Sequence, residues 1–335
     1  MAAEQVHTIR GPPLRGVVPT NRFGSAPRVR RLSAVKPGGS GRGEQGRRVA
    51  IVTDSTTYVP GAMLDSLNVE SVSLYVGWQG DLRREDEYAD LDAFYRRLHE
   101  SPALPTTSQP SIGDFLAVYR PLVQAGLDVV SIHIAEGLSG TCQSAREAAR
   151  MLAEEGHAKS VTVCDGETGA GGLGCLVVVA ARLAAAGADA ETIVEGVRAG
   201  RASLDIWFCL DTLEYLRRGG RIGAAQAAIG TALRIKPILT FGTEIAPVGR
   251  VRTHARAMER MVGCLQTLHA RGAQEWIVQH AQATADARRL VEAGRELFGH
   301  DPLFCTEVGP VLGAHLGAGV LVGGFGAAPP ITQRR

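Results

Sequence analysis

The stretch VVSIHIAEGLSGTCQSAREAARML, Val129–Leu152, decides the fold. It opens with a mostly apolar run, Val129–Ile134, of the length of a buried strand. After a short glycine-containing loop, small apolar side chains recur at the spacing of one helix face, at Ala145, Ala148, Ala149 and Leu152. The stretch therefore predicts a strand, a loop and a helix, which together form part of a βαβ unit.

Similar apolar runs lie on both sides of this stretch, at Val49–Thr53 and Ser160–Cys164. Short apolar strands that alternate with helices predict a parallel sheet covered by helices. In such sheets, ligands bind beyond the carboxyl ends of the strands.

The pattern changes from about residue 172. The run between Gly174 and Gly187 predicts a buried helix, and Asp205–Leu210 predicts a strand followed by a short helix. Lys236–Phe241 and Glu244–Thr253 flank a predicted turn at Gly242 and Thr243, which indicates a hairpin. A hairpin combined with crossover connections predicts a mixed sheet.

The remaining elements complete this second sheet. Ala255–Arg271, Glu275–His280 and Thr284–Phe298 predict a helix, a strand and a helix. The C-terminal segment predicts two strands joined by a glycine-rich turn at 309–319. We therefore expect an α/β protein with a tail at 1–48, an N-terminal α/β domain at 49–170, a C-terminal α/β domain at 171–326, and a cleft between the domains.

Composition excludes several classes of protein. Hydrophobic residues make up 45% of the 335 residues and aromatic residues only 5%, so the core must be largely aliphatic. Residues 1–48 carry a net charge of +8, whereas residues 49–335 carry −6. We expect the arginine-rich tail to be disordered. A mildly acidic body argues against a nucleic-acid binder, although a regulator that binds DNA through its tail remains an alternative.

The cysteines and the apolar runs give no sign of metal binding or membrane insertion. None of the six cysteines forms a CxxC pair or lies at metal-ligand spacing from a histidine. This usage indicates reduced, buried thiols in a cytoplasmic protein. The most apolar run is shorter than the roughly 20 residues that a bilayer requires and contains Arg182.

Polar clusters mark the candidate sites. They are Asp54-Ser55-Thr56, Thr106-Thr107-Ser108-Gln109, Ser139-Gly140-Thr141 and Gly313-Ala314-His315. The cluster that begins at Ser139 lies where a predicted helix starts, and free N–H groups and hydroxyls at that point favour a carboxylate or a phosphate. A simple helix cap is the alternative interpretation.

A serine hydrolase acting on an acyl substrate is the alternative function. Ser139, His315 and Asp54 are the residue types of a catalytic triad. However, Thr141 stands where the nucleophile-elbow motif GxSxG needs its second glycine. There is also no GxxxxGK[ST] motif for a nucleotide.

Arginines gather in the segment LEYLRRGGRIG, at Arg217, Arg218 and Arg221. They favour either a charge–dipole contact at a helix end or an exposed patch for an acidic partner.

Taken together, these segments resemble the DegV family. Its motifs occur in the order IVTDST (51–56), TSQPSIGDF (107–115), SIHIAEGLSGTCQSA (131–145), DTLEYLRRGGRIG (211–223), IKPIL (235–239), VRT (251–253) and GPVLGAHLGAG (309–319). The resemblance implies a two-domain DegV-like (EDD) fold: a three-layer α/β/α domain with a parallel sheet, then a two-layer α/β domain with a mixed sheet.

The resemblance also implies a function, that of a bacterial carrier without catalytic activity of its own. A long-chain fatty acid such as palmitate would lie between the domains, and a separate fatty acid kinase subunit would phosphorylate its carboxylate. The residues implied to hold or surround the carboxylate are Thr107, Ser108, Ser139, Gly140, Thr141 and His315, with Asp54 and Ser55 near the site. Arg217, Arg218 and Arg221 would face the kinase. No cofactor, metal or nucleic acid is implied.

Some positions depart from the family pattern. Thr57 and Tyr58 replace the usual Ala-Asp, and Cys142 replaces the usual Tyr after SGT. These changes bear on the mouth of the pocket and on chain-length preference, while the residues implied to hold the carboxylate are in place.

Overall fold

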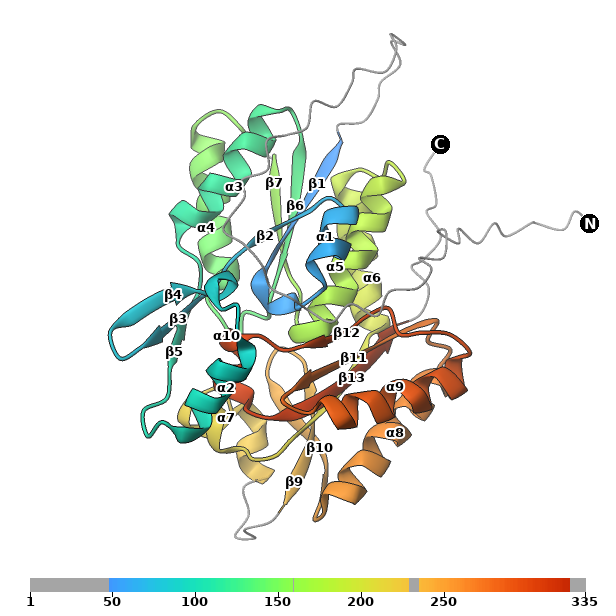
Figure 1. Ribbon diagram of the computed structural model, residues 1–335. Coiled ribbons are helices and arrows are strands. Elements are labelled where there is room, and N and C mark those ends of the chain that lie inside the picture. Colours follow the sequence, from blue (N-terminus) through green and yellow to red (C-terminus); the bar gives the residue numbers. More distant parts are fainter. Residues whose placement is uncertain (1–47, 159, 229–234, 326–335) are drawn as a thin grey trace, which may run out of the picture.

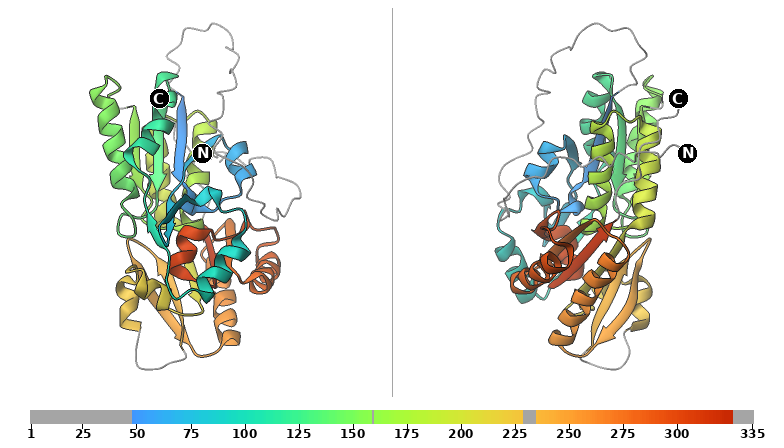
Figure 2. Two further views of the ribbon diagram at one scale, coloured as in Figure 1. Left: turned by 60° about the vertical axis from the view of Figure 1, so that its left-hand side comes forward. Right: turned by 90° about the vertical axis from the view of Figure 1, so that its right-hand side faces the viewer.

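The structure is a computed structural model that describes residues 48–158, 160–228 and 235–325 (Figure 1). The expected N-terminal tail therefore lies outside the described residues, apart from Arg48. Figure 2 shows most of the blue to yellow-green part of the chain stacked on the orange to red part.

The N-terminal sheet is parallel, as expected, with the strand order β2-β1-β6-β7. Its strands are β1 (Val49–Asp54), β2 (Val69–Val72), β6 (Asp128–His133) and β7 (Val161–Asp165). Alternate residues of β1 point to opposite faces, so Val52 packs under α3 (Ile112–Gln124) and α4 (Thr141–Glu154), while Ile51 joins the core on the other side. Helices α5 (Ala170–Ala185) and α6 (Ala190–Ser203) cover that second face (Figure 1). The α/β/α arrangement is confirmed.

The C-terminal sheet is mixed, with the order β10-β9-β8-β13-β11-β12. Its strands are β8 (Asp205–Leu210), β9 (Lys236–Phe241), β10 (Ile245–Val251), β11 (Glu275–Ala281), β12 (Cys305–Glu307) and β13 (Gly319–Phe325). Strands β9 and β10 form the predicted antiparallel hairpin, and β11 pairs in parallel with β12. Helices α8 (His254–Ala270) and α9 (Thr284–Phe298) pack on one face of this sheet.

One C-terminal prediction was wrong. The expected glycine-rich turn is a helix, α10 (Pro310–Leu316), which ends at Gly317. Pro310 suits the first helical turn, where a missing N–H costs nothing, and Gly317 adopts a φ of 65° at the end of the helix. The glycines of the segment therefore lie at both ends of a tightly packed helix and within it.

A small third sheet was not predicted. It has the order β4-β3-β5 and consists of β3 (Tyr75–Trp78), β4 (Asp81–Arg84) and β5 (Thr106–Ser108). The sheet extends from the side of the molecule, next to α2 (Leu91–Glu100) and α10 (Figure 1). The shorter elements are α1 (Gly61–Ser66), α7 (Glu214–Arg218) and the 3₁₀ turns Ser55–Thr57, Glu85–Glu87 and Gly223–Ala228.

Helix α5 is buried between the two main sheets, and it packs against β1 and β6 on one side and β11 and β13 on the other. Gly171 is required there, because a Cβ atom would lie 2.2 Å from Ile277 Cδ1. The domain division expected between residues 170 and 171 falls at the start of this helix and stays a prediction. Among the described residues, no helix is both long and apolar enough to cross a membrane.

Candidate functional site

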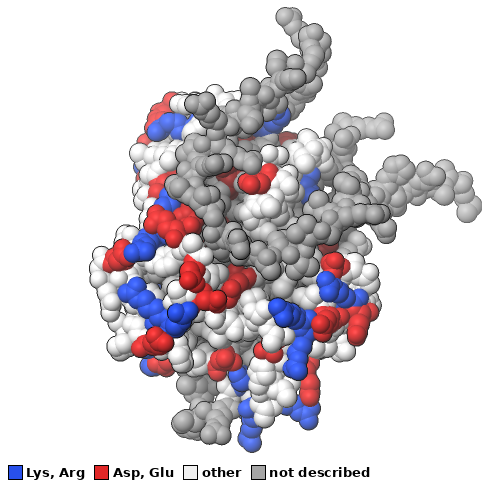
Figure 3. Space-filling model, viewed as in Figure 1, with Lys and Arg blue, Asp and Glu red and all other residues white. Residues whose placement is uncertain are grey.

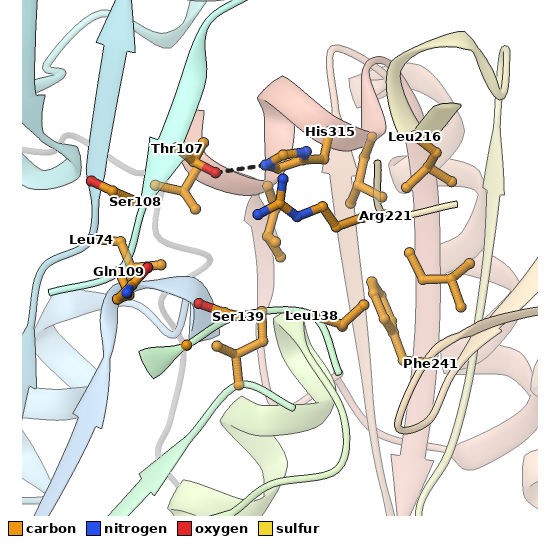
Figure 4. Close-up of a pocket in the computed structure, with 16 residues that line it drawn as sticks. Leu74, Thr107, Ser108, Gln109, Leu138, Ser139, Leu216, Arg221, Phe241 and His315 are labelled. Carbon is orange, nitrogen blue, oxygen red and sulfur yellow. Dashed lines mark hydrogen bonds between the residues drawn. The ribbon is translucent and has the colours of Figure 1, made fainter. Parts of the chain in front are cut away.

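A pocket opens beyond the carboxyl end of β6, between the N-terminal sheet, the small third sheet and the C-terminal domain (Figure 4). Its cavity volume is about 50 Å³. Its polar lining residues are Thr107, Ser108, Gln109, Ser139, Gly140, Arg221 and His315. Its apolar lining residues are Leu74, Ile134, Leu138, Leu216, Phe241, Ile245, Val311, Leu312 and Leu316. The pocket is thus amphipathic and suits a ligand that has a polar head and an apolar body.

His315 links α10 to the third sheet. Its Nε2 lies 2.7 Å from Oγ1 of Thr107, and its buried Nδ1 has no hydrogen-bond partner within the described part of the chain. Burial, assisted by the nearby positive charge of Arg221, lowers the pKa of His315 to about 4. The imidazole is therefore neutral at pH 7. Its Nδ1 is packed against Gly219, where a Cβ atom would lie 2.3 Å away, so Nε2 is the nitrogen that reaches the lining residue Thr107.

The two hydroxyl-rich loops meet at the pocket. Ser139 Oγ lies 2.8 Å from Thr141 Oγ1, and Gly140 lies under the side chain of Gln109. A Cβ atom at Gly140 would come 3.1 Å from Gln109 Nε2. Thr141 begins α4 and is fully buried behind the lining. Gln109 belongs to the pocket although no role was predicted for it.

Asp54 lies beneath the pocket and does not line it. Its fully buried carboxylate accepts hydrogen bonds from the N–H groups of Thr56 and Ile134, each at 3.0 Å, and lies 3.1 Å from Nδ1 of His133. The triad of Ser139, His315 and Asp54 that the alternative hydrolase function requires is therefore not assembled. Instead, Asp54 fixes the backbone at Ile134, where the loop that carries Ser139 begins.

His133 belongs to a buried network that was not predicted. Its Nε2 lies 2.6 Å from Ser131 Oγ, which accepts a hydrogen bond from the Tyr119 hydroxyl. All three side chains are buried in the N-terminal domain, so the network supports the sheet and is closed to a ligand. The sequence did contain a sign of this network, because polar side chains alternate at 131 and 133 within an otherwise apolar strand.

Glu85 is a second buried carboxylate behind the pocket. Ser55 donates a hydrogen bond to it, and it accepts further bonds from the Tyr58 hydroxyl and from the Val311 N–H in the first turn of α10, both at 2.8 Å. Burial raises the pKa of Glu85 from its ordinary value of 4.5 to about 7, although these hydrogen bonds act in the opposite direction. Helix α10 is thus held at its start by Glu85 and near its end by the contact between His315 and Thr107.

The structure separates the three arginines. Arg217 pairs with Glu214 at 2.7 Å, and Arg218 donates to the Pro102 carbonyl at 3.1 Å. Arg221 donates to the Gly219 carbonyl at 2.7 Å, and of the three it alone lines the pocket, beside His315 (Figure 4). Since Arg221 is also exposed, it lies at the pocket mouth.

Comparison with known proteins agrees with this architecture. The family model of DegV, a family described as uncharacterised, matches residues 48–325. This chain belongs to the DegV family. A DegV domain-containing protein of Listeria monocytogenes is 35% identical over 277 residues, covering 82% of this chain and 96% of the relative.

Two solved structures of the DegV family share the fold. A DegV family protein from Thermus thermophilus, described by its fatty acid binding, is 32% identical with a TM-score of 0.75, covering 83% of this chain and 99% of that one. DegV from Bacillus subtilis, described as a fatty acid binding protein, is also 32% identical, with a TM-score of 0.74 and coverages of 84% and 100%.

Within the described residues of this DegV family member, no group of three or more His, Cys, Asp or Glu side chains is placed to hold a metal ion. The six cysteines are free thiols, and four of them are buried. Burial raises the pKa of the Cys142 thiol, which lies under the loop that carries Ser139.

We predict that Glu85 makes stability depend on pH. The unfolded chain releases this proton near pH 4.5 and the folded protein only near pH 7. The free energy of unfolding should therefore fall as the pH rises through this window, by roughly 2–3 kcal/mol, and level off above it. Glu85→Gln should remove this fall.

The measurement is urea unfolding from pH 4.5 to 8, taken as the difference between wild type and variant so that other titrating groups cancel. Glu195→Gln, at an exposed position on α6, is the control and should leave the pH dependence unchanged. A constant difference between wild type and Glu85→Gln across the window would contradict the assigned pKa.

Proposed function

We propose that this protein binds a long-chain fatty acid, with the carboxylate at the polar side of the pocket and the tail among its apolar residues. The observation that carries this proposal is the amphipathic pocket itself. It lies between the domains of a fold shared with proteins described as fatty acid binding, at 32% identity.

The polar side suits a carboxylate that is solvated mainly by neutral donors. The hydroxyls of Thr107 and Ser139 and the N–H groups at the start of α4 can donate to its oxygens, and the neutral His315 can orient the Thr107 hydroxyl by donating its Nε2–H to Oγ1. Of the described lining residues, only Arg221 is cationic, and it lies at the mouth. We therefore place the head group between Thr107 and Ser139, close to the surface.

The apolar side offers the main driving force. A chain of 16 carbons buries about 15 methylenes at roughly 0.8 kcal/mol each, or about 12 kcal/mol before the costs of association. The cavity of about 50 Å³ is smaller than the roughly 150 Å³ of an engineered cavity that holds one benzene molecule. Aliphatic side chains such as Leu138 and Leu312 must therefore move aside when a tail enters, which subtracts from this gain.

We further propose that the bound carboxylate is presented to a separate fatty acid kinase subunit in the cytoplasm. The exposed side chains of Arg218 and Arg221 donate hydrogen bonds to backbone carbonyls. The charge of Arg218 helps to lower the pKa of the nearby Glu214, and both guanidinium groups remain accessible to a partner. An acidic partner surface would complement them directly beside the head group.

The alternatives are less well supported. A serine hydrolase would need Asp54 at His315, whereas Asp54 bonds to His133. The described part of the chain offers no support for DNA binding, since acidic and basic side chains are interspersed on the face in Figure 3, while the alternative of DNA binding through residues 1–48 lies outside the described residues.

The first prediction concerns the ligand. Mass spectrometry of an organic extract of the purified protein should find a saturated or monounsaturated long-chain acid near one per chain. Adding palmitate to delipidated protein should raise the melting temperature by mass action. Hexadecanol, which lacks the carboxylate, is the matched control and should have a smaller effect. An extract without lipid, together with no shift on titration, would disprove the proposal.

The second prediction concerns the carboxylate. Loss of one hydrogen bond to a charged group costs about 1.5–3 kcal/mol, so Thr107→Ala and Ser139→Ala should each weaken palmitate binding roughly 10- to 100-fold. Thr106→Ala is the control, because this neighbouring exposed hydroxyl does not line the pocket. Calorimetric titration measures all three. Wild-type affinity in both pocket variants would place the carboxylate elsewhere.

The third prediction concerns the partner. Arg218→Ala and Arg221→Ala should lower acyl-phosphate production at a fixed concentration of cognate kinase, and Arg218→Glu and Arg221→Glu should lower it further because like charges repel at an interface. Palmitate affinity should remain that of the wild type. Arg256→Glu, on α8, serves as control. Loss of affinity in the Arg221 variants would show that this guanidinium holds the head group itself, and full activity of the Glu variants would exclude this docking face.

A further inference from the structure

The pocket has a direction. Ser108, Gln109 and Ser139 lie on one side in Figure 4, together with Leu74, and Leu138, Leu216 and Phe241 lie on the other. An acyl chain whose carboxylate lies between the hydroxyl-rich loops therefore points its tail toward Phe241. This step rests on the proposed function.

Phe241 is the aromatic residue of the lining, and a second ring holds it in place. It ends β9, and its ring stacks on that of Phe208 from β8, with a centroid distance of 4.4 Å and an interplanar angle of 22°. Both rings are almost fully buried, at 3% and 1% exposure. A stacked and enclosed ring has no free rotamer to adopt, whereas an aliphatic lining residue can change rotamer when a tail arrives.

Backbone segments close the space around this ring. A Cβ atom at Gly169 would lie 3.7 Å from Phe241 Cε1 and 3.6 Å from Ile134 Cδ1, so ordinary packing already fills that side. Nearby, Gly137 meets the β9–β10 turn so closely that a Cβ atom would lie 1.9 Å from the Thr243 carbonyl oxygen. The loop that carries Leu138 and Ser139 is thereby pressed against the turn that follows Phe241.

We propose that Phe241, backed by Phe208, is the fixed wall that limits how far an acyl chain reaches into the pocket and so sets the longest chain that the protein accepts. Each methylene that fits adds about a fourfold gain in affinity. Beyond the wall, further methylenes must stay outside the pocket or bend back, and the gain ends.

The test is a series of dissociation constants for saturated acids from 12 to 20 carbons, measured on delipidated full-length protein. In wild type, affinity should rise with length and then level off or fall. Phe241→Leu should move this limit upward by about two carbons and raise the affinity ratio of the 20-carbon to the 16-carbon acid about tenfold. Phe241→Trp should move the limit downward.

Two further variants distinguish a specific effect at Phe241 from a general loosening of the core. Phe304→Leu makes a similar gap at a buried phenylalanine outside the lining, and it should leave the limit unchanged. Phe208→Leu removes the support behind the ring and should raise the limit, which also tests the proposal if Phe241→Trp does not fold. An unchanged limit in folded Phe241→Leu and Phe208→Leu would overturn the inference. Failure of wild type to bind any acid would instead overturn the proposed function.

Discussion

The pocket depends on a buried contact that fixes the two domains against each other. Gln279 of β11 accepts a hydrogen bond from the Gly171 N–H at 2.6 Å and donates to the Thr57 carbonyl at 3.1 Å. Thr306 adds a bond to the Tyr58 carbonyl at 2.8 Å. Since each of these groups is buried, separating the domains would leave them unsatisfied at a cost of about 1–3 kcal/mol each. A cleft between domains can therefore act as a defined pocket.

Two buried carboxylates then support the pocket wall from behind. Asp54 holds the backbone at Ile134, and Glu85 holds the first turn of α10 at Val311. Neither lines the pocket, so each serves to position the loops and the helix that do. This arrangement explains how conformationally free hydroxyl-rich loops can present their donors to a single point, since their backbone ends are fixed in the core.

Much of the fold could be predicted because it is local. The runs at β1, β6 and β8 show their burial directly, and Thr284–Phe298 was predicted to the residue. The third sheet escaped prediction because its strands are only three or four residues long, and because β4 and β5 are made mostly of polar residues. Helix α10 was mistaken for a turn, since its glycines mark close packing: a Cβ atom at Gly313 would lie 2.5 Å from the Tyr95 hydroxyl. Packing of this kind depends on distant partners that the local pattern does not contain.

The site divides in the same way. The sequence singled out Thr107 and Ser139, which line the pocket, because hydroxyls at strand ends and helix starts are visible in sequence; their role toward a carboxylate stays a prediction. The partners of Asp54 and Glu85, in contrast, are set by tertiary structure. The same distinction explains the charge at the site. A neutral His315 avoids the cost of burying a cation before the ligand arrives, and the single arginine at the mouth stays hydrated. Under the proposals made above, an anionic head group at this position would be stabilised by donors already in place, and the ring of Phe241 would select among tails by their length.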